Sequence, residues 1–185
     1  AQIQAGEILF NGKNLLTMTG DALAEIQGND MSMVFQEPMT SLNPVKKIGW
    51  QVAESLKIHT SLSEDEIHSR VVSILADVGL PNPEELCKKY PHQLSGGMRQ
   101  RVMIAMAMIC WPKLLIADEP TTALDVTVQA QILQLLRKIH AEANTSILFI
   151  SHDLNVVKEI CQKVIVMYQG KIVETGYTEE VLYHP

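Results

Sequence analysis

Two adjacent carboxylates follow an apolar run and have the types and spacing to hold a metal ion and activate water. Residues 114–117 are apolar, and Asp118, Glu119 and Pro120 come directly after them. Proline biases the residue before it towards extended backbone, where successive side chains point in opposite directions. We therefore expect Asp118 to reach a magnesium ion and Glu119 to face an attacking water as a base. A solvated strand end followed by a turn is the structural alternative.

A turn of small residues, Ser95-Gly96-Gly97, precedes an apolar run and could bind an anion. Glycine lets backbone N–H groups approach a ligand closely, and the helix that follows adds its positive end. Ser95 could equally be the N-cap of an ordinary buried helix, and the two interpretations are compatible. Residues 99–101, Arg-Gln-Arg, are then interpreted as the polar side of that helix.

Three more polar residues lie where elements are expected to begin or end. Gln36 follows an expected strand over 31–35, His152 follows one over 146–150, and Asp125 precedes a helix starting near residue 126. The carboxyl ends of parallel strands form one edge of a sheet, so Gln36, Asp118, Glu119 and His152 should lie close together. His152 is expected to contact a terminal phosphate. Gln36 could be a plain loop residue, and Asp125 could be only a helix cap.

The elements that must position these residues follow from periodicity. Asn-Gly at 11–12 predicts a hairpin within 6–15, and Gln-Gly at 169–170 predicts another within 164–174. Helical spacing indicates two helices between 48 and 80, the second opened by a Ser63–Glu66 capping box, then helices over 102–111 and 128–139. The runs 114–117 and 146–150 are typical of parallel strands buried on both faces. Alternating strands and helices predict an α/β fold with a mostly parallel sheet.

Composition excludes several classes of protein. The 185 residues suffice for one core, or for a core with a small subdomain. A net charge of -6 without a Lys/Arg block argues against a protein that binds nucleic acid. Three separated cysteines indicate a reducing cytosol rather than a disulfide framework or a zinc site. The longest apolar run, 102–111, is about half of the ~20 residues that a membrane-spanning helix needs.

Taken together, these motifs resemble the ATP-binding cassette (ABC) ATPases in order and spacing. Gln36, residues 94–98, residues 114–119, residues 123–125 and His152 resemble that family's Q-loop, signature motif, Walker B strand with its glutamate, D-loop and switch histidine. The oligopeptide/dipeptide importer branch is closer still, on the three segments 35–44, 90–93 and 117–126. The resemblance covers essentially the whole chain.

The resemblance implies a P-loop NTPase-like (RecA-type) core with an inserted helical subdomain. Residues 1–36 would be the remnant of an N-terminal β-subdomain, 37–111 the helical signature subdomain and 112–185 the RecA-like core. The implied ligands are ATP and Mg²⁺: Asp118 and Gln36 near the metal, Glu119 polarising water and His152 on the γ-phosphate. The residues expected to act in trans, on ATP held by a second subunit, are Ser95, Gly96, Gly97 and Asp125.

The implied partners are a second ATPase subunit in a homo- or heterodimer and transmembrane permease subunits, which would be contacted through the region after Gln36. A periplasmic or extracellular solute-binding protein would take part indirectly, and nucleic acid would not. ATP would close the dimer and hydrolysis would reopen it. We expect a peripheral protein on the cytoplasmic face of the cell membrane.

The chain contains no G-x-x-x-x-G-K-[ST] phosphate loop, since neither Gly12-Lys13 nor Gly170-Lys171 has the surrounding pattern. Because this loop and an initiator Met are both missing, we expect a chain that is truncated at both ends and inactive alone. Its sheet should then have an exposed edge and an uncovered apolar face. Alternatives are an importer for nickel or another small solute, a non-catalytic docking or dimerisation fragment, and a non-transport cassette ATPase of DNA repair or translation. The last is disfavoured because the helical segment has no long insertion.

Overall fold

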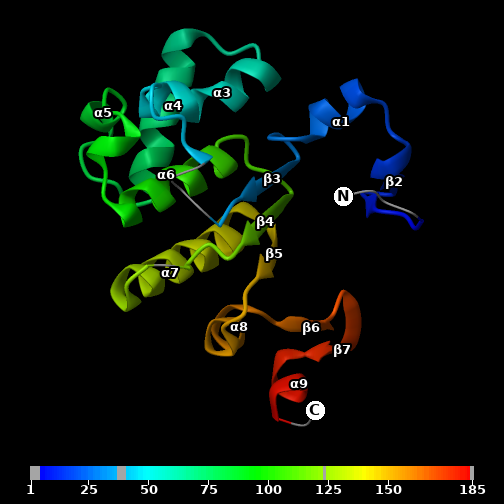
Figure 1. Cartoon of the computed structure of the whole chain (residues 1–185). Helices are drawn as coiled ribbons and strands as arrows, with labels where there is room; N and C mark the ends of the chain where they lie inside the picture. Colours follow the sequence, from blue (N-terminus) through cyan, green and yellow to red (C-terminus); the bar gives the residue numbers. More distant parts are fainter. Residues whose placement is uncertain (1–4, 37–40, 123, 184–185) are drawn as a thin grey trace.

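A three-stranded parallel sheet lies at the centre of the computed structural model, which describes residues 5–36, 41–122 and 124–183 (Figure 1). Its strands are β3 (Met31–Val34), β4 (Leu114–Asp118) and β5 (Ser146–Ile150), in the order β3-β4-β5. Val34 pairs with Ala117, and Asp118 pairs with Ile150. All three carboxyl ends therefore lie along one edge, and the predicted α/β class with a parallel sheet is confirmed.

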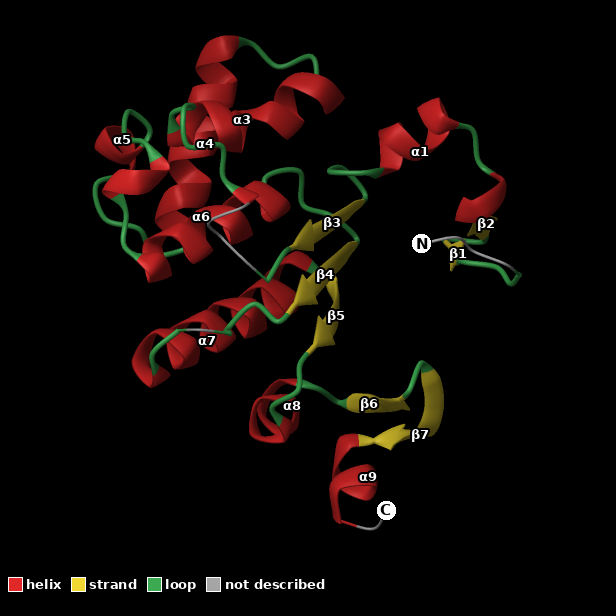
Figure 2. Ribbon diagram, in the orientation of Figure 1, coloured by secondary structure: helices red, strands yellow, loops and turns green. Residues whose placement is uncertain are grey.

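Two long helices cover one face of this sheet (Figure 2). They are α6 (Gly96–Met108) and α7 (Val126–Ala143). The side chains that the strands turn towards them, among them Val34 and Leu115, are fully buried in the main hydrophobic cluster. At about 25 cal/mol per Å² of apolar area removed from water, this face is the main source of the sheet's stability.

A helical layer packs on α6. It contains α3 (Ile48–His59), α4 (Glu64–Asp77), the short α5 (Pro83–Leu86) and the 3-10 turn η2 (Pro91–Gln93). The predicted capping box is present at the start of α4, because Ser63 accepts from the Glu66 N–H while the Glu66 carboxylate accepts from the Ser63 N–H. The two helices predicted between residues 48 and 80 are thus confirmed.

Two hairpins lie outside the central sheet. The first joins β1 (Leu9–Phe10) to β2 (Lys13–Asn14), followed by η1 (Leu15–Thr17) and α1 (Gly20–Ile26). The second joins β6 (Lys163–Tyr168) to β7 (Lys171–Tyr177), between α8 (Leu154–Ile160) and α9 (Thr178–Tyr183). Both predicted turns have positive φ at their two central residues, which is the backbone that Asn-Gly favours.

The second face of the sheet is open, so the prediction that the strands are buried on both faces is wrong. Leu148 and Ile150 of β5 are 48% and 43% exposed, and Met33 of β3 is exposed beside them. The apolar run alone cannot show how many faces are covered, and no helix of the described residues lies on this one. The uncovered apolar face that the family resemblance implied is therefore present.

The division of the chain into three parts at residues 36 and 111 stays a prediction. Strand β3 of the first part pairs with β4 of the third.

In the described part of the chain, no helix has the length and apolar character needed to cross a membrane.

We predict that the isolated 185-residue chain self-associates through this open face, because parallel sheets are normally buried on both sides. Leu148→Lys should shift the chain towards monomer, with a change in unfolding free energy of about 0.5 kcal/mol or less because the site is exposed. Size-exclusion chromatography with light scattering over a range of concentrations measures this. Ile58→Lys, on the exposed side of α3, is the matched control and should change nothing. A wild-type chain that stays monomeric throughout would refute the prediction.

Candidate active site

The carboxylate of Glu119 receives hydrogen bonds from three side chains. Gln36 Nε2 donates to Oε2 over 3.0 Å, and Thr122 Oγ1 donates to the same oxygen over 2.8 Å. His152 donates through Nδ1 to Oε1 over 3.0 Å. The structure thus brings together Gln36, Glu119 and His152, each of which follows a different strand of the sheet. This is the convergence expected from the carboxyl ends of parallel strands.

The backbone of Glu119 is left-handed, with φ +45°, so the expectation of an extended residue before Pro120 is wrong. The Glu119 N–H donates to the Ile150 carbonyl over 3.0 Å, and its own carbonyl accepts from the Thr122 N–H over 3.2 Å. These bonds turn the chain immediately after β4. A left-handed non-glycine residue costs about 1–3 kcal/mol and persists where its surroundings determine it, commonly at functional sites.

Asp118 has different surroundings from Glu119, as predicted, although not through simple strand alternation. It is the last residue of β4, is half-buried, and accepts no side-chain hydrogen bond from the residues the structure describes. Gln36 uses its amide nitrogen on Glu119, which leaves its amide oxygen as a ligand. One carboxylate and one amide oxygen, completed by waters and phosphate oxygens, suit Mg²⁺. Within the described ranges, no group of three or more His, Cys, Asp or Glu side chains could hold a metal alone.

Glu119 and His152 stabilise each other's charged form. The hydrogen bond from His152, then that from Thr122, lowers the pKa of Glu119 below its ordinary 4.5. The hydrogen bond to Glu119, together with its charge, raises the pKa of His152 above its ordinary 6.5. Each partner thus favours the charged form of the other, and the pair is open to solvent on the histidine side, where 73% of the His152 side chain is exposed.

Ser95 and Asp125 are both helix caps, so the structural alternative holds for each. The Ser95 hydroxyl accepts from the Met98 N–H over 3.3 Å at the start of α6, and the Asp125 carboxylate accepts from the Val128 N–H over 2.9 Å at the start of α7. Anion binding at these ends stays a prediction. Among the described residues, no hydrogen bond or ion pair links either cap to Glu119.

Gly97 is required by packing of α6 against α7. A Cβ on Gly97 would lie 2.8 Å from Cγ1 of Val128, whereas one on Gly96 would meet nothing within 4 Å. The two glycines thus have different roles: Gly97 allows the two helix starts to touch, and Gly96 is the one facing open space.

The interpretation of residues 99–101 as a polar helix side is wrong. Gln100 is only 2% exposed, and the Arg99 Nε donates to the Pro91 carbonyl over 2.9 Å. Arg101 donates to the Val78 carbonyl at the end of α4 and to Oε1 of Gln131 on α7. Arg99 and Arg101 donate to backbone carbonyls and to Gln131, whereas the buried Nε2 of Gln100 has no hydrogen-bond partner among the described residues; the residue types alone reveal neither.

A family comparison agrees with this geometry. The family model described as "ABC transporter" matches residues 1–122. The chain belongs to the ABC transporter family. The Bacillus subtilis "Oligopeptide transport ATP-binding protein OppD" is 52% identical over 180 residues, covering 97% of this chain and 50% of that protein. The "Dipeptide transport ATP-binding protein DppD" of the same organism is 49% identical over 185 residues, covering 100% and 55%. This ABC family chain thus spans about half the length of these relatives.

Solved structures confirm the cassette fold. The dimeric post-hydrolysis structure of the ATP-binding cassette MJ0796 bound to ADP and Pi has a TM-score of 0.84 and 28% identity, covering 95% of this chain and 74% of that one. The structure of cbiO1 from Clostridium perfringens has a TM-score of 0.82 and 32% identity, covering 98% and 69%.

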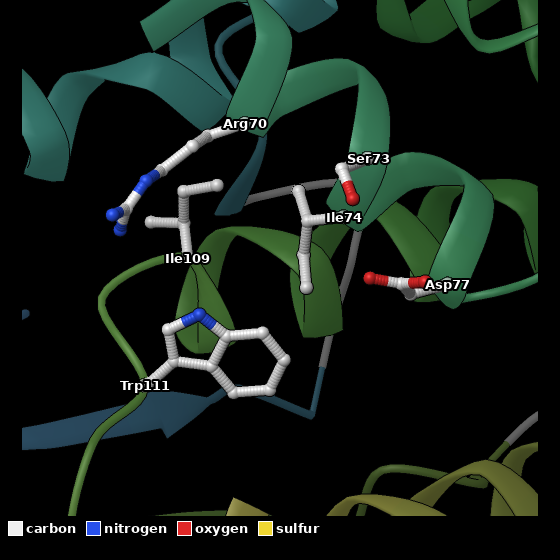
Figure 3. A pocket seen from close by; sticks show the side chains of 6 residues that line it. All are labelled: Arg70, Ser73, Ile74, Asp77, Ile109 and Trp111. Carbon is white, nitrogen blue, oxygen red and sulfur yellow. The ribbon is translucent and has the colours of Figure 1, made fainter. Parts of the chain in front are cut away.

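One shallow pocket of about 210 Å³ lies away from Gln36, Glu119 and His152 (Figure 3). It lies between α4 and the end of α6, with Ile74 and Trp111 between the charged groups of Arg70 and Asp77. Its volume is below the ~300 Å³ at which small-molecule sites begin. None of the predicted site residues lines it, so it is not the nucleotide site.

We predict that Gly97→Ala lowers the free energy of unfolding by about 1–3 kcal/mol relative to Gly96→Ala, because only the former forces Val128 to move. Both changes gain similar helix propensity, which makes Gly96→Ala the matched control. Urea denaturation measures the difference. Val128→Ala should remove most of it in a double-mutant cycle, and equal effects of the two alanines would contradict the packing argument.

We predict that the pKa of His152 lies above 6.5 and falls in Glu119→Gln, measured by NMR titration of the imidazole signals. Stability from protonated His152 is present below pH 6.5 and lost as pH rises through its higher folded-state pKa. Stability from ionised Glu119 is present above pH 4.5 and lost as pH falls through its lower folded-state pKa. The pair should therefore contribute most between pH 4.5 and 6.5. Glu142→Gln, at the end of α7, is the control, and an unchanged His152 in Glu119→Gln would disprove the coupling.

Proposed function

We propose that this chain is the ATP-binding and ATP-hydrolysing, energy-coupling part of an ABC importer for oligopeptides or dipeptides. The observation that carries the proposal is the meeting of Gln36, Glu119 and His152 at the carboxyl ends of parallel strands. The names of its relatives, which are peptide-transport ATP-binding proteins, support the peptide branch.

The chemistry proposed for the site is hydrolysis of the terminal phosphate of ATP. Glu119, ionised in the structure, would orient and deprotonate the attacking water, and His152 would contact the γ-phosphate. Asp118 and the amide oxygen of Gln36 would hold Mg²⁺, which neutralises charge on the phosphates when bound. Phosphoryl transfer depends on positioning and charge stabilisation, and these four residues would supply part of both, with a phosphate loop needed for the rest.

The starts of α6 and α7 are proposed to act on ATP bound by a second subunit, identical or related. Ser95, Gly96 and Gly97 would offer backbone N–H groups to the γ-phosphate, and Asp125 would cross the same interface. Their support is geometric: Gly96 faces open space, and the contact between Gly97 and Val128 keeps the two capped helix ends together. The MJ0796 relative is described as dimeric.

A permease contact is proposed for the region after Gln36, of which residues 37–40 lie outside the described residues. In the described part, the buried Gln51 amide holds this loop: it accepts from the Asn43 N–H and donates to the carbonyls of Asn43 and Lys46. Val45 stands out at 75% exposed, and the Lys46 ammonium lies 4.5 Å from the exposed Trp50 ring. A rigid loop with exposed apolar side chains suits a protein partner.

This contact would place the protein peripherally on the cytoplasmic face of the membrane, with a solute-binding protein acting through the permease and no role for nucleic acid. The 185 residues carry no phosphate loop, so we propose that they do not hydrolyse ATP by themselves.

A chimera tests the proposed function. The matching 180 residues of the B. subtilis OppD protein, 52% identical, are replaced by this chain, and oligopeptide uptake is measured in cells lacking the native protein. We expect uptake and ATPase activity to persist. Glu119→Gln in the chimera should lower the ATPase rate by roughly 100-fold or more, as for loss of a general base.

Two controls accompany the chimera. Glu142→Gln, an exposed acid at the end of α7, should leave both activities unchanged. The isolated 185-residue chain should show no Mg-ATP binding at micromolar nucleotide. A folded chimera without ATPase activity, or full activity of its Glu119→Gln variant, would overturn the proposed function.

A further inference from the structure

We propose that Thr122 is a positioning residue: it holds Oε2 of Glu119 so that Oε1 remains the oxygen directed at the reacting water. This inference rests on the proposed function of Glu119 as a base. Thr122 was not among the residues expected from the sequence to take part in the site.

The two oxygens of the Glu119 carboxylate have unequal surroundings. Oε2 accepts from Thr122 over 2.8 Å and from Gln36 over 3.0 Å, whereas Oε1 accepts from His152 alone among the described side chains. A carboxylate held through one oxygen by two donors has a fixed direction for the other. The orientation of Oε1 is therefore set by what binds Oε2.

Thr122 differs from the other two donors in its origin. It follows Glu119 by three residues in the same turn, and its N–H donates to the Glu119 carbonyl over 3.2 Å. Gln36 and His152 come from the ends of other strands, and each has a second proposed task, on the metal and on the phosphate. Thr122 has no second proposed task, so its hydrogen bond to Glu119 does not depend on how a substrate engages the other two.

The turn that carries Thr122 is well anchored. Thr121 beside it is 6% exposed, and its carbonyl accepts from the Leu124 N–H over 3.3 Å. The left-handed Glu119 and the hydrogen bond from the Thr122 N–H to its carbonyl keep Thr122 in the same turn as the carboxylate that its hydroxyl contacts. The short hydrogen bond between Thr122 and Glu119 is thus part of the local fold and needs no ligand to form.

The experiment compares Thr122→Val, which keeps the shape and removes the donor, with Thr122→Ser, which keeps the hydroxyl. The readout is the NMR titration of His152 in the 185-residue chain, since that imidazole senses where Oε1 points; Asp153, which also raises the pKa of His152, is unchanged in both variants. Circular dichroism verifies folding, and Thr122→Ala replaces the valine variant if the latter does not fold.

We expect the pKa of His152 to fall in Thr122→Val and to keep its wild-type value in Thr122→Ser. Glu142→Gln, which changes an exposed acid at the end of α7, is the matched control and should leave the pKa of His152 at its wild-type value. An unchanged or higher His152 pKa in Thr122→Val, a loss in Thr122→Ser equal to that in Thr122→Val, or a change of the same size in Glu142→Gln would each overturn the proposal. The measurement uses no nucleotide, so its failure is distinct from failure of ATP hydrolysis in the chimera.

Discussion

The carboxylate of Glu119, through the hydrogen bonds that it accepts, is the group on which the site depends. It joins segments that are 83 and 33 residues away in the chain, through Gln36 and His152. The parallel ladder of β3, β4 and β5 makes this possible, because only strands running in one direction present their ends at a common edge. The buried face under α6 and α7 fixes that ladder. Core packing thus fixes where the turn after β4 lies, and with it the position of the Glu119 carboxylate.

Much of this arrangement follows from local patterns and one topological rule. Periodicity locates the helices and strands, and the meeting of parallel strand ends brings Gln36, Glu119 and His152 together without knowledge of any contact. The left-handed backbone of Glu119 does not follow, because it depends on the Ile150 carbonyl of a neighbouring strand. Thr122 is missed for the same reason: two threonines follow Pro120, and only the turn decides which hydroxyl faces the carboxylate.

Other differences arise where residue type was taken as a guide to exposure. Gln100 is polar and yet buried, and the half-buried Arg101 joins the end of α4 to Gln131 of α7. Leu148 and Ile150 are apolar and yet exposed. Whether a side chain is exposed depends on the element that packs against it. The sequence of a strand therefore cannot show whether its second face is covered. The caps Ser95 and Asp125 can be predicted from the sequence, because a cap forms its hydrogen bond with its own helix.

The charge state of the site has a consequence for the proposed chemistry. While His152 donates to Oε1, the pKa of Glu119 is held low, and a carboxylate of low pKa is a weak base towards water. In the proposed mechanism, His152 would therefore have to leave Oε1 before Glu119 acts as a base. A phosphate is an anion and accepts the same N–H, so moving the His152 N–H onto it exchanges one hydrogen bond to an anion for another. In that proposed mechanism, the hydrogen bond between His152 and Glu119 would restrain the base until an anionic substrate competes for the histidine.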